Sequence, residues 1–296
     1  MESYLSHQSA AVLWDIPNID VVLGFDPAPS GITETTVATL RERRRKKGTI
    51  THLRDALLPP GATVQHRGVH TASPELLFLE FAENLSIQRL IFLGLQMCSH
   101  PPGKPAQAIT SKEKISKFLS KVSGHRGGRK AGRAAKYLAD GSASVMESLA
   151  YMVFSLPHSL GGYGLKGAVF NFRIELDADA KKRLGQRYCY TDIYYGRAKL
   201  AVEYNSFAHH GKPSQQGKDA VRSAILERQG ITVMALNTIQ LYDAHACRDF
   251  ALNLAAGLGA RMQIRTEKFE AMNRLLREML PSRDSAYLNR AAWKSE

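Results

Sequence analysis

The sequence predicts a mixed α/β (α+β) protein whose main domain has an αβββαβ core, preceded by a smaller, mainly helical N-terminal domain. Apolar residues at helical spacing follow Ser144, and strand-forming residues fill 168–176 and 188–205. A helical pattern over 218–230 then precedes the apolar stretch 231–236. The β-α-β connection at the end of this order favours a last strand that runs parallel to its neighbour.

Residues 188–205 predict two strands joined by a short turn at Gly196. Because side chains alternate faces along a strand, Asp192 shares a face with Glu203 if the register sets it opposite Ala201 or Glu203. Two carboxylates on neighbouring strands repel each other unless a cation or protons lie between them, and oxygen ligands suit Mg²⁺ or Mn²⁺. We therefore predict that Asp192 and Glu203 are metal ligands. The alternative is that both are solvated strand residues.

The two acids belong to a longer pattern. It consists of Asp192, then Ala-Val-Glu203-Tyr-Asn-Ser-Phe-Ala-His209, then Asp219-Ala-Val-Arg222 and Gly230-Ile-Thr-Val. Over about residues 140–245 the chain resembles the Vsr-like branch of the restriction-endonuclease fold, in the PD-(D/E)xK superfamily. The resemblance implies a restriction-endonuclease-like αβββαβ core and hydrolysis of phosphodiester bonds with Mg²⁺ or Mn²⁺. Asn205-Ser206 replaces the Asp-Gly usual in that family, and no Lys follows Glu203 at the superfamily spacing.

That resemblance implies four catalytic residues: Glu147, Asp192, Glu203 and His209. Asp192 and Glu203 would hold the ion, and Glu147 would orient water or metal from the first helix. His209 would transfer a proton or contact a phosphate, because imidazole titrates near neutral pH. Two structural alternatives stay open. Glu147 is also a first-turn acid that compensates the helix dipole, and His209 is also a candidate turn residue hydrogen-bonded to backbone.

Positive charge points to a polyanionic partner. The 296 residues include 40 Lys and Arg against 27 Asp and Glu, a net charge of +13. Nucleic acid is the commonest such partner, and we favour DNA over RNA. We predict contacts to it from basic residues of two dense runs and of the later helix: Arg43, Arg44, Arg45, Lys121, Arg126, Arg129, Lys130, Arg133 and Arg222. Alternatively, the runs are solvated surface, and Arg222 pairs with Asp219 within its helix.

The N-terminal part predicts a short helix over 6–17, small strands within 49–72, and helices that begin after Ser73 and Ser86. Its opening Ser-His-Gln-Ser-Ala-Ala-Val-Leu-Trp and its later His-Thr-Ala-Ser-Pro-Glu resemble the C-terminal domain of AbiEi-like abortive-infection antitoxins, over about residues 5–98. The predicted domains are an AbiEi-antitoxin-like domain (1–100), a basic helical linker (101–140), an endonuclease-like domain (141–260), and a C-terminal helix and tail (261–296).

Other classes are disfavoured. Three cysteines at unrelated spacings suggest neither a disulfide framework nor a cysteine zinc site. We find no signal-peptide pattern, and the longest apolar run is too short to cross a bilayer, so we expect a cytoplasmic protein without a membrane partner. The sequence thus predicts a metal-dependent endonuclease in phage defence or DNA repair. The alternative is a non-catalytic nucleic-acid-binding or antitoxin-like regulator that keeps the nuclease fold. The sequence does not indicate an oligomeric state.

Overall fold

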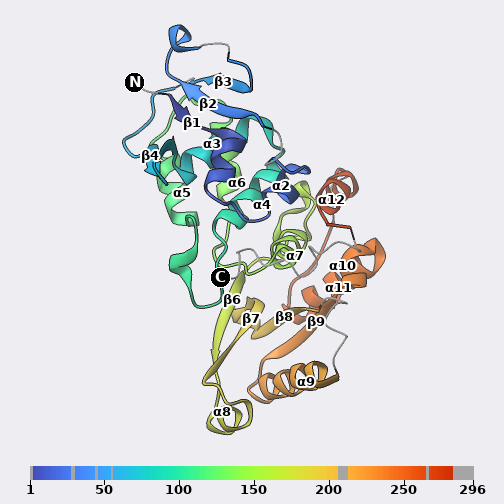
Figure 1. Cartoon of the computed structure of the whole chain (residues 1–296). Coiled ribbons are helices and arrows are strands. Elements are labelled where there is room, and N and C mark those ends of the chain that lie inside the picture. Colours follow the sequence, from blue (N-terminus) through green and yellow to red (C-terminus); the bar gives the residue numbers. More distant parts are fainter. Residues whose placement is uncertain are drawn as a thin grey trace. The chain divides into compact units, whose positions relative to one another are not determined.

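The computed structural model of the chain divides into two compact units (Figure 1). The described residues are 3–27, 31–43, 46–54, 56–205, 213–264 and 267–282, with backbone alone over 213–219. The first unit comprises Met1–Ser99 and Gln107–Asp140, and the second comprises His100–Ala106 and Gly141–Glu296. The stretch predicted as a basic linker, 101–140, is therefore mostly part of the first unit.

The first unit contains a five-stranded mixed sheet of order β3-β2-β1-β5-β4. Its strands are β1 (Tyr4–Leu5), β2 (Thr33–Val37), β3 (Thr49–Leu53), β4 (Thr63–His66) and β5 (Val69–Ala72). Strand β2 pairs antiparallel with β1 and parallel with β3. The β2–β3 register sets Thr36 opposite His52. Since side chains two residues apart share a face, Glu34 and His52 project from the same side of this sheet.

Two apolar helices form the core of this unit. Its helices are α1 (His7–Leu13), α2 (Ile19–Leu23), α3 (Pro74–Asn84), α4 (Ile87–Met97), α5 (Lys112–Leu119) and α6 (Gly128–Ala135), with 3-10 turns at Leu40–Glu42 and Pro105–Gln107. The predicted caps are confirmed, because Ser73 and Ser86 accept hydrogen bonds from the backbone at the starts of α3 and α4. Ile115 of α5 and Ala131 of α6 are fully buried, so the apolar sides of both basic helices complete the core. That burial is why the linker prediction was wrong over these helices.

The second unit has a four-stranded sheet of order β6-β7-β8-β9. Its first elements are α7 (Val145–Ser155), β6 (Ala168–Glu175), α8 (Ala178–Leu184), β7 (Tyr188–Tyr195), β8 (Leu200–Asn205), α9 (Pro213–Arg228) and β9 (Thr232–Asn237), with 3-10 turns at His158–Leu160 and Gly196–Ala198. Apart from the short α8, this is the predicted order. The last strand, β9, pairs parallel with β8 as predicted.

The chain after β9 forms two consecutive helices, α10 (Thr238–Tyr242) and α11 (Ala244–Gly257). Asp243 breaks them, because its backbone is extended and its carboxylate accepts a hydrogen bond from Ala246 N, which caps α11. Within the predicted C-terminal helix and tail (261–296), the helix is α12 (Phe269–Arg277). Among the described helices, none has the length and apolarity needed to cross a bilayer.

Candidate functional site

Three polar side chains form one row across the sheet of the second unit. The β6–β7 pairing sets Phe170 opposite Ile193 and Phe172 opposite Thr191, so Asn171 stands opposite Asp192. The β7–β8 pairing ends with Ile193 opposite Val202, one residue before the two acids. Residues directly opposite one another on paired strands project to the same face. Regular continuation of this register by one residue would bring Asp192 opposite Glu203, which is the arrangement that the prediction requires.

Asp192 occupies the middle of this row. Its Oδ2 accepts a hydrogen bond of 2.8 Å from the backbone N of Tyr204 on β8. Burial raises the pKa of the Asp192 carboxyl group, against the opposing effects of that hydrogen bond and of the Arg222 charge. The site thus favours a proton or a cation at Asp192.

Glu147 lies in the first turn of α7 and is 7% exposed. Its Oε2 accepts hydrogen bonds of 2.8 Å from Ala143 N and Asn171 Nδ2, and its Oε1 accepts one of 2.9 Å from Ser144 Oγ. Burial and, to a smaller extent, the charge of Asp192 together raise the pKa of Glu147 to about 8, while these hydrogen bonds oppose the shift. The predicted third acid is therefore held next to the sheet acids. Near neutral pH it keeps its proton unless a cation replaces it.

Asn171 joins α7 to the sheet, and the sequence analysis missed it. Its Nδ2 donates hydrogen bonds to Glu147 and, at 2.9 Å, to the backbone oxygen of Gly141. Its φ is 43°, in the left-handed region that Asn tolerates better than most residues at a cost of about 1 kcal/mol. The available signal was a lone Asn between Phe170 and Phe172 in a strand pattern.

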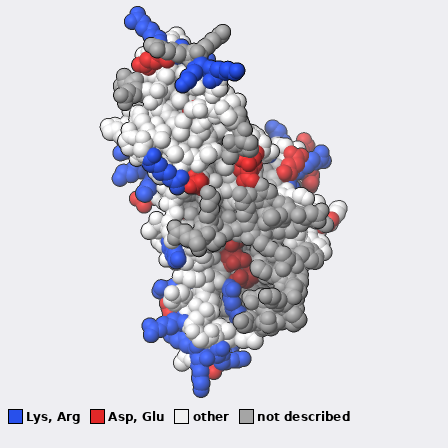
Figure 2. All heavy atoms as spheres, in the orientation of Figure 1, with Lys and Arg blue, Asp and Glu red and all other residues white. Residues whose placement is uncertain are grey.

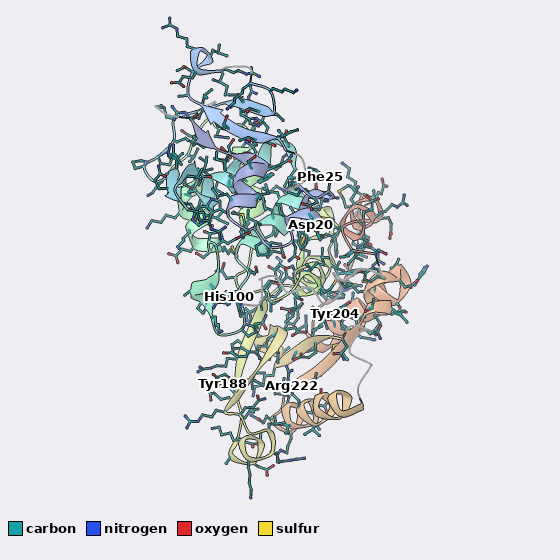
Figure 3. All side chains as sticks on the ribbon, in the orientation of Figure 1. Asp20, Phe25, His100, Tyr188, Tyr204 and Arg222 are labelled. Atoms are coloured by element: carbon teal, nitrogen blue, oxygen red, sulfur yellow. The ribbon has the colours of Figure 1, made fainter. Side chains whose placement is uncertain are left out.

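Arg222 reaches the same row from α9 (Figure 3). Its Nη2 donates to Glu203 Oε1 at 2.9 Å and to the backbone oxygen of Tyr190. The side chains are 30% exposed for Arg222 and 16% exposed for Glu203. Arg222 was predicted to contact nucleic acid, and the structure pairs it with a site acid. His209 lies outside the described residues, as does the side chain of Asp219.

The metal prediction for the sheet acids stays a prediction. Glu147, Asp192 and Glu203 do not each bring an oxygen within 4.8 Å of the others, whereas His7, Glu34 and His52 do meet that distance. Within the described part of the chain, those three are the one group of at least three His, Cys, Asp or Glu side chains that does so. The His7–Glu34–His52 group can hold a metal ion, and the sequence analysis missed it.

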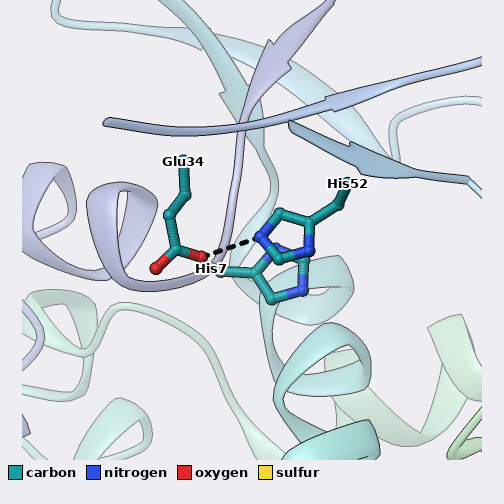
Figure 4. A group of neighbouring side chains, drawn as sticks. All are labelled: His7, Glu34 and His52. Atoms are coloured by element: carbon teal, nitrogen blue, oxygen red, sulfur yellow. Dashed lines mark hydrogen bonds and ion pairs between the residues drawn. The ribbon is translucent and has the colours of Figure 1, made fainter. Parts of the chain in front are cut away.

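The histidine group lies in the first unit, on three separate elements (Figure 4). His52 Nε2 lies 3.0 Å from Glu34 Oε2, and the rings of His7 and His52 stack with centroids 3.8 Å apart. Glu80 of α3 accepts hydrogen bonds from Tyr4 Oη and from His7 N. Burial raises the pKa of Glu80 to about 8 and lowers that of His7 to about 4, so His7 is a neutral imidazole at pH 7. Because no local spacing relates these residues, sequence patterns did not indicate the group.

The predicted basic contacts have different surroundings. Arg44 and Arg45 lie outside the described residues, and Arg43, Lys121, Arg126, Arg129 and Arg133 are exposed. Lys130 instead donates from Nζ to the backbone oxygens of Glu83 and Leu85, at the end of α3. It therefore has a structural role in closing that helix.

A further basic surface covers α8, where Figure 2 shows Lys and Arg side chains gathered. Lys181, Lys182 and Arg183 are exposed there, and the Arg173 guanidinium lies 5.1 Å from the ring centre of Tyr188. The basic run 181–187 was visible in the sequence, but the analysis did not use it.

No family model, curated protein or solved structure matches this chain. The likenesses to Vsr-like nucleases and to AbiEi-like antitoxins therefore stay predictions from short motifs.

Proposed function

We propose that the second unit is a metal-dependent nuclease that hydrolyses phosphodiester bonds of nucleic acid, with the restriction-endonuclease-like core that its motifs resemble. One observation carries the proposal. Strand β7 carries Asp192 between β6, whose Asn171 binds buried Glu147, and β8, whose Glu203 pairs with Arg222. Buried acids such as Glu147 are costly unless protons or a cation compensate them. We expect DNA as the substrate, in the cytoplasm, in phage defence or DNA repair.

Each residue of the proposed site has its own role. Asp192 and Glu203 would hold Mg²⁺ or Mn²⁺, and the bound ion would polarise the phosphate and lower the pKa of a water molecule. Asn171 fixes the position of the Glu147 carboxyl group, which can then hold or release a proton next to the row. Arg222 would turn from Glu203 toward the phosphate, because guanidinium groups bind phosphates with paired hydrogen bonds. The basic surface over α8 supports a polyanionic substrate.

The test is cleavage of plasmid DNA, single-stranded DNA and RNA by the full-length protein, with Mg²⁺ or Mn²⁺. Asp192→Asn keeps an oxygen for Tyr204 N but removes the charge, and Glu203→Gln does the same at the second position. Each should lower cleavage by at least about 100-fold. Glu175→Gln removes an exposed acid of β6 and should leave cleavage unchanged. Full activity in both site variants would rule out the proposed site.

A second function has one observation in its favour. The ion pair with Arg222 already neutralises Glu203, and Asn205 stands where the resembling family has an acid. A non-catalytic, antitoxin-like regulator that binds nucleic acid would need no free metal ligand here. Binding that weakens steeply with salt, with no cleavage in any divalent metal, would select this function.

A further inference from the structure

The first unit contains a cavity of about 390 Å³ beside the histidine group. His7, His52 and Glu80 line it, together with the basic side chains Arg43, Arg54, His125 and Arg126. The cavity therefore joins possible metal ligands to groups that attract anions.

The three possible ligands are positioned by well-defined elements. Glu34 and His52 project from the same face of the paired strands β2 and β3. His7 begins α1, next to β1, with its backbone in the left-handed region at a φ of 50°. For a residue other than Gly or Asn, this conformation costs about 1 kcal/mol or more. The fold therefore holds His7 in a strained conformation that brings its ring onto His52.

The simpler explanation is a structural one, in which a buried acid is hydrogen-bonded to a histidine. It leaves two acids in the interior, since Glu34 is 6% exposed and Glu80 is 3% exposed. Among the described residues, each of these acids has a histidine as its ion-pair partner: His52 for Glu34 and His7 for Glu80. A buried carboxylate is expensive unless it is paired with a full positive charge or binds a metal. A divalent cation bound by Glu34 would supply that charge.

We propose that His7, Glu34 and His52 bind a Zn²⁺ ion. Two imidazoles and one carboxylate form a donor set that zinc uses where a fourth position stays open. Mg²⁺ and Ca²⁺ instead prefer oxygen ligands throughout, so this group is chemically distinct from the sheet acids. The two rings lie at an interplanar angle of 19°, and each can bring a nitrogen within 4.8 Å of the other and of a Glu34 oxygen. Glu80, 3.9 Å from His7 Nδ1, is placed to orient the His7 ring.

His7 and His52 line the cavity, so a fourth zinc ligand would enter from it, and the surroundings of the cavity define that ligand. Arg43, Arg54 and Arg126 line the same space, where Arg126 also lies 3.6 Å from Glu83, and guanidinium groups favour planar or tetrahedral oxyanions. The cavity therefore takes an oxyanion of the phosphate class as the fourth zinc ligand.

Zinc binding is measured by calorimetry and by metal analysis on the full-length protein, freed of metal and kept in excess Mg²⁺ to saturate oxygen-ligand sites. We expect one Zn²⁺ per chain. His52→Gln and Glu34→Gln should each weaken binding by at least about 100-fold, since loss of a supporting partner alone costs 10- to 100-fold. His245→Gln changes an exposed histidine elsewhere and should have no effect. Glu203→Gln should also keep zinc, which separates this site from the proposed nuclease site.

X-ray absorption on the zinc-loaded natural protein tests the ligands without any variant. It should show imidazole nitrogen and carboxylate oxygen at about 2.0–2.2 Å from the metal. The zinc site is overturned if the spectrum shows no imidazole ligand, if the protein binds no Zn²⁺, or if His52→Gln binds Zn²⁺ with unchanged affinity. Inorganic phosphate should raise the melting temperature of the zinc-loaded protein more than that of the zinc-free protein, and Arg54→Gln should remove the difference. An equal phosphate effect in both forms overturns the oxyanion assignment.

Discussion

The substitution Glu147→Gln tests whether burial holds a proton on the carboxyl group next to the sheet row. Its pKa in the folded chain, about 8, lies above the ordinary 4.5. Between these values the folded state carries a proton that the unfolded chain has lost. The group's contribution to the free energy of unfolding is therefore complete below about pH 4.5 and is lost as pH rises to about 8. At about 1.4 kcal/mol per pKa unit, the loss reaches up to about 5 kcal/mol.

Glutamine reproduces the protonated form of Glu147. Its oxygen can accept the hydrogen bonds from Ala143 N and Asn171 Nδ2, and its amide can donate to Ser144 Oγ. The side chain is too buried for solvent to screen the difference strongly. The variant should match the natural protein near pH 5 and exceed its stability above pH 8 by about 3 to 5 kcal/mol.

The assay is urea unfolding followed by circular dichroism, in the presence of a chelator, from about pH 5 to about pH 9. Glu175→Gln serves as the matched control, because this exposed acid should change stability by less than about 0.5 kcal/mol at every pH. A stability difference between Glu147→Gln and the natural protein that stays constant over this range would show that Glu147 is ionised in the folded chain. The reasoning from burial would then be refuted.

Two further predictions concern packing in the second unit. Arg222→Ala leaves the partly buried Glu203 without its ion partner and should cost about 2 kcal/mol in urea unfolding, whereas Arg173→Ala, in an exposed pair, should cost less than about 1 kcal/mol. Equal losses would mean that the Glu203 pair is as weak as a surface pair. Gly161→Ala should cost about 3 kcal/mol by calorimetric melting, because φ is 91° and the new methyl group meets the backbone of α12. Gly185→Ala, with a positive φ but open space, should cost about 1 kcal/mol, and a similar cost for both would show that α12 moves aside.

Local patterns predicted most of the second unit. The alternation in 188–205 was sufficient for the hairpin, and Ser144 marked the start of α7. The role of Asn171 depends on a helix 24 positions earlier in the chain, so no local spacing reveals it. Arg222 was assigned to the surface because a helical pattern does not say which acid an arginine will meet.

The first unit was harder to predict from the sequence. His7, Glu34 and His52 meet only because β2, β3 and α1 are brought together by the sheet, and such long-range pairing leaves no mark in neighbouring residues. The proline-rich stretch at 100–105 looked like the start of a linker because proline is common in linkers. The apolar residues of α5 and α6 were the better guide, since they belong to the core.

The path of the chain has a consequence for how this protein is made. Residues 100–106 belong to the second unit, and the chain then returns to the first for 107–140. When only the first hundred residues have emerged from the ribosome, α3 and α4 are exposed, because α5 and α6, which complete their core, have not yet been made. Their leucines and phenylalanines stay open to chaperones until α6 emerges, and any expression fragment of the first unit should therefore extend to residue 140.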